Sequence, residues 1–201
     1  MNVAQVMQTS PVIPVLVIED AAYARPIAEA LVAGGLRVLE VTLRTAAALE
    51  VIAEMVKVEG AIVGAGTVLN EAELRASIDA GAQFIVSPGL TEPLGKAAIA
   101  SGIPFLPGTA NAGDIMRGLD MGLTHFKFFP AEAAGGIKAL KSLAGPFGQA
   151  RFCPTGGITL ASAPEWLALE AVLCVGGSWI VPAGAPDVAA ITAAAKAASA
   201  R

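Results

Sequence analysis

The chain has 201 residues, of which 55% are hydrophobic and 15% are charged, and its formal net charge is −4. This length suits one α/β domain of barrel size, so we expect a single domain over residues 1–201. An acidic chain without a cluster of Lys and Arg lacks the basic surface of a nucleic-acid-binding protein. The mean hydropathy is +0.66, yet no apolar run approaches the ~18 residues of a spanning helix, so we expect no membrane partner.

The first ten residues carry no signal pattern of basic and then apolar residues, which predicts a cytoplasmic location. Residues 3–7 are instead typical of a short amphipathic helix. The two cysteines, Cys153 and Cys174, lie in apolar strand candidates without CxxC or Cys/His spacing. That spacing predicts buried thiols and neither a metal site nor a disulfide.

Apolar runs that end at Gly, Pro, Ser or Thr predict eight strands. They cover residues 12–18, 37–42, 61–66, 83–87, 103–107, 125–129, 151–154 and 172–175. Helical patterns lie between them, with candidate N-cap residues at their starts, and residues 187–200 supply the last helix. The candidate caps are Thr45, Asn70, Thr91, Asn111 and Thr159.

The carboxyl ends of these strands recur every 19 to 28 residues, which is the length of one βα unit. Strict alternation over eight units favours a closed (β/α)8 TIM barrel. An open doubly wound sheet usually has a glycine-rich turn after its first strand, and the turn at 18–20 contains no glycine. We therefore predict an α/β fold of the (β/α)8 class, in one domain with a short N-terminal helix.

Lys127 is the one lysine within an apolar strand candidate, at 125–129. Burial disfavours the ammonium form there and leaves an amine nucleophile, which suggests Schiff-base chemistry. A structural ion pair with a buried carboxylate is the alternative. The other lysines lie on polar faces of predicted helices and are interpreted as surface charges.

Glu40 lies near the end of a second apolar strand candidate, where a carboxylate is costly to bury without a partner. Because carboxyl ends of barrel strands converge on one mouth, we expect Glu40 near Lys127 as a general acid and base. The alternative is a structural ion pair with Arg37 or Arg44.

Other unusual residues are also expected at this mouth. Arg44 could bind a substrate carboxylate through two parallel hydrogen bonds, or it could be a surface arginine. Thr67 and Thr155 would place hydroxyl groups at the mouth, although threonine also caps helices. Pro88 and Phe129 would supply apolar walls that keep the lysine dry.

Two glycine pairs follow the predicted seventh and eighth strands, at Gly156-Gly157 and Gly176-Gly177, and Ser178 follows the second pair. Barrels commonly bind phosphate in these two loops, through backbone amides that glycine exposes. The pattern predicts a phosphate ester as substrate, with Ser178 as a further donor. The alternative is that the glycines only form tight turns.

Six segments together resemble the family of 2-keto-3-deoxy-6-phosphogluconate (KDPG) aldolases of the Entner–Doudoroff pathway, which includes 4-hydroxy-2-oxoglutarate (KHG) aldolases. The segments are Leu39-Glu40-Val41-Thr42-Leu43-Arg44-Thr45, Gly64-Ala65-Gly66-Thr67-Val68, Ser87-Pro88-Gly89, Phe126-Lys127-Phe128-Phe129-Pro130-Ala131-Glu132, Cys153-Pro154-Thr155-Gly156-Gly157 and Gly176-Gly177-Ser178-Trp179. The resemblance extends from about residue 11 to 182.

This resemblance implies a class I aldolase that needs no metal or other cofactor, is usually a homotrimer, and releases pyruvate and glyceraldehyde 3-phosphate. It makes Lys127 the Schiff-base lysine and Glu40 the general acid and base. The substrate-binding residues would be Arg44, Thr67, Pro88, Phe129 and Thr155, and the phosphate-binding residues Gly156, Gly157, Gly177 and Ser178. The segment 108–111 does not match the family pattern, and its role stays open.

Two other functions remain as alternatives. A phosphosugar isomerase or epimerase could use Glu40 as a proton-abstracting base and Lys127 as an electrophilic cation. A non-catalytic phosphosugar-binding protein would need neither residue, so their costly burial disfavours it. A metal-dependent aldolase is disfavoured because the only histidine, His125, is expected deeper in the barrel than Lys127.

Overall fold

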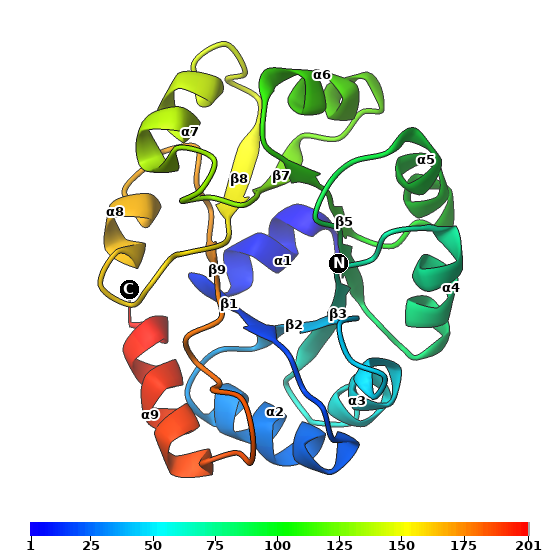
Figure 1. Cartoon of the computed structure of the whole chain (residues 1–201), viewed down its shortest axis with the longest axis vertical. Coiled ribbons are helices and arrows are strands. Elements are labelled where there is room, and N and C mark those ends of the chain that lie inside the picture. Colours follow the sequence, from blue (N-terminus) through cyan, green and yellow to red (C-terminus); the bar gives the residue numbers. More distant parts are fainter. Residues whose placement is uncertain (201) are drawn as a thin grey trace.

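Strands and helices alternate along the chain in the computed structural model, which describes residues 1–200 (Figure 1). The strands are β1 (Val12–Leu16), β2 (Val38–Thr42), β3 (Ile62–Gly66), β4 (Phe84–Val86), β5 (Phe105–Leu106), β6 (Gly108–Thr109), β7 (His125–Phe128), β8 (Arg151–Pro154) and β9 (Val175–Gly177). The α-helices are α1 (Val3–Thr9), α2 (Ala24–Ala33), α3 (Ala48–Met55), α4 (Glu71–Asp79), α5 (Glu92–Ser101), α6 (Ala112–Asp120), α7 (Gly136–Ala144), α8 (Ala163–Leu167) and α9 (Val188–Ser199), and a 3₁₀ turn, η1, covers Ala21–Tyr23.

All strand pairs are parallel. The strands form two hydrogen-bonded sheets, with the orders β5-β4-β3-β2-β1-β9 and β6-β7-β8. Only Pro107 separates β5 from β6, and its carbonyl accepts a hydrogen bond from the Lys127 amide at 2.8 Å. At the other end, isolated parallel bridges join Phe152 to Val172 and Thr155 to Gly176. The structure is therefore an α/β fold whose parallel sheet is strongly curled.

The N-terminal helix α1 lies in the middle of the curled sheet, and helices α2 to α9 lie outside the strands (Figure 1). Asn2 and Gln5 form a capping box that fixes the start of α1. Val6 and Met7 are buried against interior residues of the sheet, including Val38 at the start of β2. The predicted N-terminal helix is thus confirmed, and it packs against the interior of the sheet.

Most predicted strands are confirmed with shifts of one or two residues at their ends, and the range Arg151–Pro154 is unchanged. The prediction for 103–107 was wrong in one respect, because Pro107 divides that strand into β5, which pairs with β4, and β6, which pairs with β7. Proline has no amide hydrogen to donate to a ladder, so it interrupts the pairing there.

The prediction for the last strand was also wrong. Residues 172–175 were expected, but β9 is Val175–Gly177, and Val172 makes only an isolated bridge. Gly176 and Gly177 are therefore strand residues rather than loop residues. A Cβ at Gly176 would overlap Thr155, and one at Gly177 would overlap the Trp179 ring. These close neighbours explain why glycine occupies a strand here.

The helix-cap predictions hold in part. Asn70 and Asn111 each accept a hydrogen bond from the backbone amide three residues on, as expected of N-caps. Thr91 occupies the cap position of α5 without a side-chain bond. The prediction for Thr45 was wrong, because α3 begins three residues later. Thr45 instead donates to the carbonyl of Ile18. Thr159 accepts a hydrogen bond from the amide of Ser162 at 3.2 Å, as an N-cap does, but the regular part of α8 begins only at Ala163.

None of the helices in residues 1–200 is both long and apolar enough to cross a membrane. The two thiols, Cys153 and Cys174, are both buried, as the sequence predicts.

Candidate active site

Lys127 and Glu40 are in direct contact. Lys127 is the third residue of β7 and Glu40 the third residue of β2, and Nζ donates a hydrogen bond to Oε1 at 3.0 Å. Their side chains are only 7% and 4% exposed. The structure therefore brings together the two residues that the sequence singles out, in a buried place that favours proton exchange between them.

An apolar wall lies beside the amine. The Phe129 ring centroid is 5.4 Å from Lys127 Nζ, within the range of a cation–π contact. The amide of Phe129 donates to the carbonyl of Thr109 at 3.1 Å, which holds this residue against β6. Pro88, half-buried after β4, is close to the same strand, because its carbonyl lies where a Cβ on Gly108 would be.

The carboxylate of Glu40 fits a space left by Gly66. A Cβ on Gly66 would overlap the carboxylate and lie 2.6 Å from Glu40 Cγ. The next residue, Thr67, has φ of +61°, and it is the one residue other than glycine with positive φ among residues 1–200. Left-handed backbone is costly for a residue with a Cβ and is concentrated at functional sites.

Neither arginine that the sequence offered as a partner for Glu40 pairs with it in residues 1–200. Arg37 Nε donates to the carbonyl of Gly60 at 2.9 Å. Arg44 lies two residues past the end of β2, with an exposed side chain that makes no ion pair in the described part of the chain. The alternative of an arginine ion pair is therefore wrong.

The loop after β8 holds the first glycine pair in an unusual backbone conformation. Gly156 and Gly157 have φ of +105° and +81°. Thr155 is buried, and its carbonyl accepts from the Ala131 amide at 2.8 Å. The carbonyl of Gly156 accepts from the Glu132 amide at 3.1 Å. Such positive φ values need glycine, and the loop is fixed against the segment after β7.

The second glycine pair is placed differently from the first. Gly177 is the last residue of β9, and Ser178 is exposed directly after it. The bridge between Thr155 and Gly176 makes the ends of β8 and β9 neighbours. The four residues predicted to bind phosphate therefore lie at two adjacent strand ends.

Sequence reasoning missed Thr109. Its side chain is buried, and Oγ1 donates to the carbonyl of Lys127 at 3.3 Å. A threonine directly after Gly108 at the end of a strand was a usable signal, but the segment 108–111 had no assigned role. Thr109 thus holds the main chain of the lysine in place.

Two thiols lie at neighbouring strands on the inner side of the sheet. Cys153 is opposite Lys127 in the ladder of β7 and β8. The pKa of Cys174 is raised well above its usual range, chiefly by a hydrogen bond with Cys153 and then by complete burial. The thiol of Cys174 therefore stays protonated, and the interior next to the lysine carries no thiolate charge from it.

A buried amine in contact with a carboxylate, in the interior of a parallel α/β sheet, is the arrangement that Schiff-base enzymes use on carbonyl substrates. The family model for KDPG and KHG aldolase matches residues 3–194. The chain therefore belongs to the KDPG and KHG aldolase family.

Curated relatives agree with this assignment. The chain is 64% identical over 199 residues to a 2-dehydro-3-deoxy-phosphogluconate aldolase from Zymomonas mobilis, and the aligned region covers 99% of this chain and 96% of the relative. It is 58% identical over 181 residues to a KHG/KDPG aldolase from Escherichia coli, which covers 90% of this chain and 85% of the relative.

Solved structures are similar as well. KDPG aldolase of Zymomonas mobilis ZM4 with 3-phosphoglycerate superposes with a TM-score of 0.97 at 65% identity, covering 98% and 95% of the two chains. A second structure is KDPG aldolase from Legionella pneumophila, with pyruvate captured at low pH as a covalent carbinolamine intermediate. It superposes with a TM-score of 0.96 at 47% identity, covering 99% of this chain and 98% of that one.

Proposed function

We propose that this protein is a class I aldolase that cleaves KDPG to pyruvate and glyceraldehyde 3-phosphate in the Entner–Doudoroff pathway. The observation that carries the proposal is the buried contact of 3.0 Å between Lys127 Nζ and Glu40 Oε1. It is supported by the family membership and by the relative from Zymomonas mobilis at 64% identity. A structural ion pair would need neither the family motifs around it nor the glycine-rich strand ends.

In the first half of the proposed reaction, the Lys127 amine attacks the 2-keto carbon and forms a carbinolamine. Loss of water then gives a protonated imine, and Glu40 moves the protons that this dehydration requires. The related enzyme from Legionella pneumophila was captured with pyruvate at the carbinolamine stage.

In the second half, Glu40 takes the proton from the C4 hydroxyl group, directly or through water. The C3–C4 bond breaks, glyceraldehyde 3-phosphate leaves, and the protonated imine accepts the electron pair to become an enamine. Protonation at C3 and hydrolysis of the imine release pyruvate and restore the free amine.

We assign the pyruvate half of the substrate to the strand ends around Lys127. Arg44 and Thr67 would hold the carboxylate, and Pro88, Phe129 and Thr155 would line the pocket. The position of the Phe129 ring, 5.4 Å from Nζ, supports this assignment. The exposed Arg44 side chain is free to turn toward an anion, for which its planar fork suits a carboxylate.

We assign the phosphate to Gly156, Gly157, Gly177 and Ser178. The positive φ values of Gly156 and Gly157 and the adjacent ends of β8 and β9 support this assignment. Backbone amides that no side chain shields are well suited to phosphate oxygens. The related enzyme from Zymomonas mobilis was crystallised with 3-phosphoglycerate, which carries a phosphate ester.

Activity on KHG is a second candidate, since the Escherichia coli relative carries both substrates in its name. KHG has no phosphate group, so a site that uses the four phosphate residues should prefer KDPG. Pyruvate release from each substrate, followed at matched concentrations, tests this order. A kcat/KM that is equal or higher for KHG would overturn the preference.

We also propose that the curled sheet is a closed (β/α)8 barrel in one domain over residues 1–201. The isolated bridges from Phe152 to Val172 and from Thr155 to Gly176, and the interruption of only one residue between β5 and β6, support closure. A homotrimer and a cytoplasmic location are proposed from the family resemblance. Sedimentation analysis tests the trimer, and unchanged activity in EDTA tests the expected independence from metals.

The isomerase or epimerase alternative shares the barrel and the phosphate site but forms no imine. Sodium borohydride reduces a protonated imine and leaves a stable adduct on the lysine. Incubation with KDPG followed by borohydride therefore separates the two functions. Rearranged sugar phosphate without pyruvate release would support the alternative.

A further inference from the structure

The turn after β4, residues 87–90, is packed against the strand that adjoins the nucleophile. Ser87 is buried, and its Oγ donates to the carbonyl of Gly89 at 2.6 Å. A Cβ on Gly108 would overlap the carbonyl of Pro88 and lie 2.7 Å from the Gly89 amide nitrogen. Gly108 in turn pairs with Lys127 in the ladder of β6 and β7. The position of Pro88 is therefore coupled to the position of the nucleophile.

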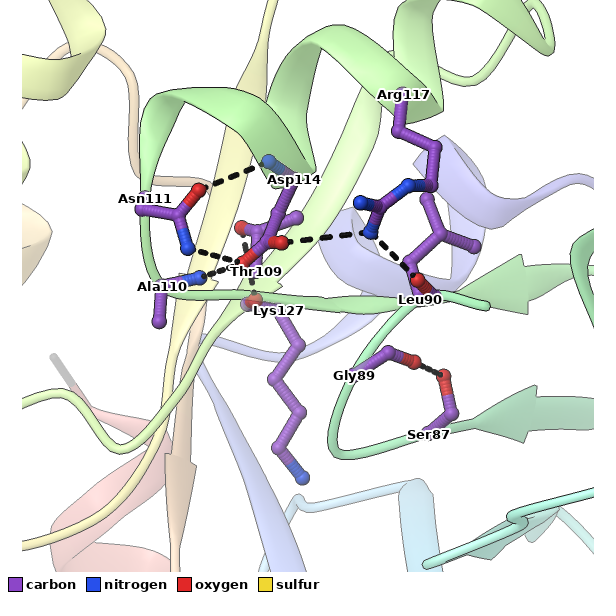
Figure 2. Close-up of polar contacts among 9 residues, drawn as sticks. All are labelled: Ser87, Gly89, Leu90, Thr109, Ala110, Asn111, Asp114, Arg117 and Lys127. Atoms are coloured by element: carbon purple, nitrogen blue, oxygen red, sulfur yellow. Dashed lines mark hydrogen bonds and ion pairs between the residues drawn. The ribbon is translucent and has the colours of Figure 1, made fainter. Parts of the chain in front are cut away.

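Helix α6 holds this turn from the outside (Figure 2). Arg117 Nη1 donates to the carbonyl of Leu90 at 3.0 Å and lies 3.5 Å from Asp114 Oδ1. The other oxygen of Asp114 accepts from the amide of Ala110 at 2.9 Å and from Asn111 Nδ2 at 3.0 Å. Two side chains of one helix thus link the loop after β4 to the loop after β6.

Helix capping explains only part of this network. The bonds among Ala110, Asn111 and Asp114 are local and fix the start of α6. The bond from Arg117 to Leu90 joins residues 27 positions apart and serves no cap. Both partners are also held by the core. Leu90 is buried, and Gly118, the residue after Arg117, packs so closely on the ring of Phe126 that a Cβ there would overlap it.

We propose that Arg117, oriented by Asp114, is a positioning residue that keeps Pro88 against the pyruvate half of the pocket. This inference rests on the proposed aldolase function. Loss of the bond to Leu90 removes the hydrogen bond that ties this turn to α6, so Pro88, whose carbonyl abuts Gly108 beside Lys127, is held less firmly. A displacement of about 1 Å near a reacting centre can lower the rate strongly, even when the catalytic groups are intact.

The role predicts a selective defect. Imine formation between Lys127 and pyruvate should become slower, whereas the affinity for phosphate at the ends of β8 and β9 should not change. An arginine with only a surface role would alter neither. Arg75 offers a matched control, because it forms an exposed ion pair with Glu71 within α4.

The experiment compares the unchanged protein with Arg117→Gln, Arg117→Lys and Arg75→Gln. Two quantities are measured: the rate at which pyruvate and borohydride modify Lys127, and the inhibition constant of inorganic phosphate against KDPG cleavage. Arg117→Gln should slow trapping by roughly 10-fold and leave phosphate inhibition unchanged. Arg117→Lys, which can still donate to the Leu90 carbonyl, should recover part of the rate, and Arg75→Gln should match the unchanged protein.

Asp114→Asn provides a second variant that keeps an acceptor for Ala110 but removes the charge facing Arg117, and it should show a smaller loss of the same kind. Equal trapping rates in Arg117→Gln and the unchanged protein would overturn this inference alone, as would a parallel loss of phosphate inhibition. The absence of any adduct in the unchanged protein would overturn the proposed function itself.

Discussion

Lys127 Nζ lies 3.0 Å from Glu40 Oε1, although the two residues are 87 positions apart in the sequence. They come from β7 and β2, which share no ladder, so the contact exists only because the sheet curls. Both side chains are almost completely buried. Burying a lysine and a glutamate side chain together costs desolvation free energy, so proton transfer between the two groups explains the contact better than a contribution to stability does.

Replacing Glu40 with Gln keeps the shape of the side chain but removes its ability to accept a proton. We expect kcat to fall by roughly 10²- to 10⁴-fold, the usual contribution of a positioned acid and base. KM should change little, because the amide still fills the same space. Steady-state kinetics on KDPG measure both parameters.

Glu54→Gln is the control for this prediction, since the Glu54 carboxylate forms an exposed ion pair with Lys57. Such pairs contribute about 0–1 kcal/mol to stability, so activity should be unchanged. Turnover by Glu40→Gln at the rate of the control would reduce Glu40 to a structural ion.

Gly66→Ala tests whether the glycine keeps the carboxylate in place. The new methyl group would overlap the Glu40 carboxylate, so the side chain must move away from Lys127. Turnover should fall by at least roughly 10-fold, as expected for a misplaced catalytic group. The kcat of the variant and its circular dichroism spectrum check the effect and the retention of the fold.

Gly148→Ala is the matched control, because a Cβ there meets nothing within 4 Å. A double variant, Gly66→Ala with Glu40→Gln, should be little worse than Glu40→Gln alone, since both changes act on one group. Full additivity of the two losses would show that Gly66 acts elsewhere.

The sequence predicted the parts of the site that depend on chemistry carried by single residues. A lysine and a glutamate in apolar strands are unusual in any fold, and the predicted convergence of parallel strand ends was enough to expect them together. The end of the last strand was missed because a run of apolar residues ends at glycine, whereas β9 continues through Gly176 and Gly177. Their space is filled by Thr155 and Trp179, which no local pattern reveals.

The link from Arg117 to Leu90 was also beyond sequence reasoning. Asp114 and Arg117 are three positions apart, which is the spacing of an ordinary surface pair on a helix. Only the packing of α6 beside the loop after β4 gives the arginine a partner at long range. Thr45 does not cap a helix for a similar reason, because its hydroxyl group donates to the carbonyl of Ile18, in the loop after β1.

Ser178→Ala tests the phosphate assignment. A hydrogen bond to a charged group contributes about 1.5–3 kcal/mol, so KM for KDPG should rise by roughly 10-fold or more. The kcat/KM for KHG, which has no phosphate, should stay the same. Ser142→Ala on α7 is the control, as its hydroxyl group bonds only to the helix carbonyl of Lys138 in the described structure. An equal loss with both substrates would contradict the assignment.

His125 should make the fold sensitive to mild acid. Its pKa is lowered from the usual 6.5, first by burial and then by the charge of Arg151. The unfolded chain therefore binds a proton more readily than the folded one, and stability falls as the pH drops below about 6.5. The midpoint of urea unfolding, measured at pH 7.5 and pH 5.5, should decrease less in His125→Gln than in the unchanged protein. An identical decrease in both proteins would remove His125 from this role.

The central claim is that the amine of Lys127 forms a covalent imine with the 2-keto acid. Incubation with pyruvate and sodium borohydride, followed by peptide mass spectrometry, tests it most directly. We predict one reduced pyruvate on Lys127, and none on the exposed Lys96, which pairs with Glu92. Failure to modify Lys127 while KDPG is still cleaved, or modification of other lysines to the same extent, would contradict the account.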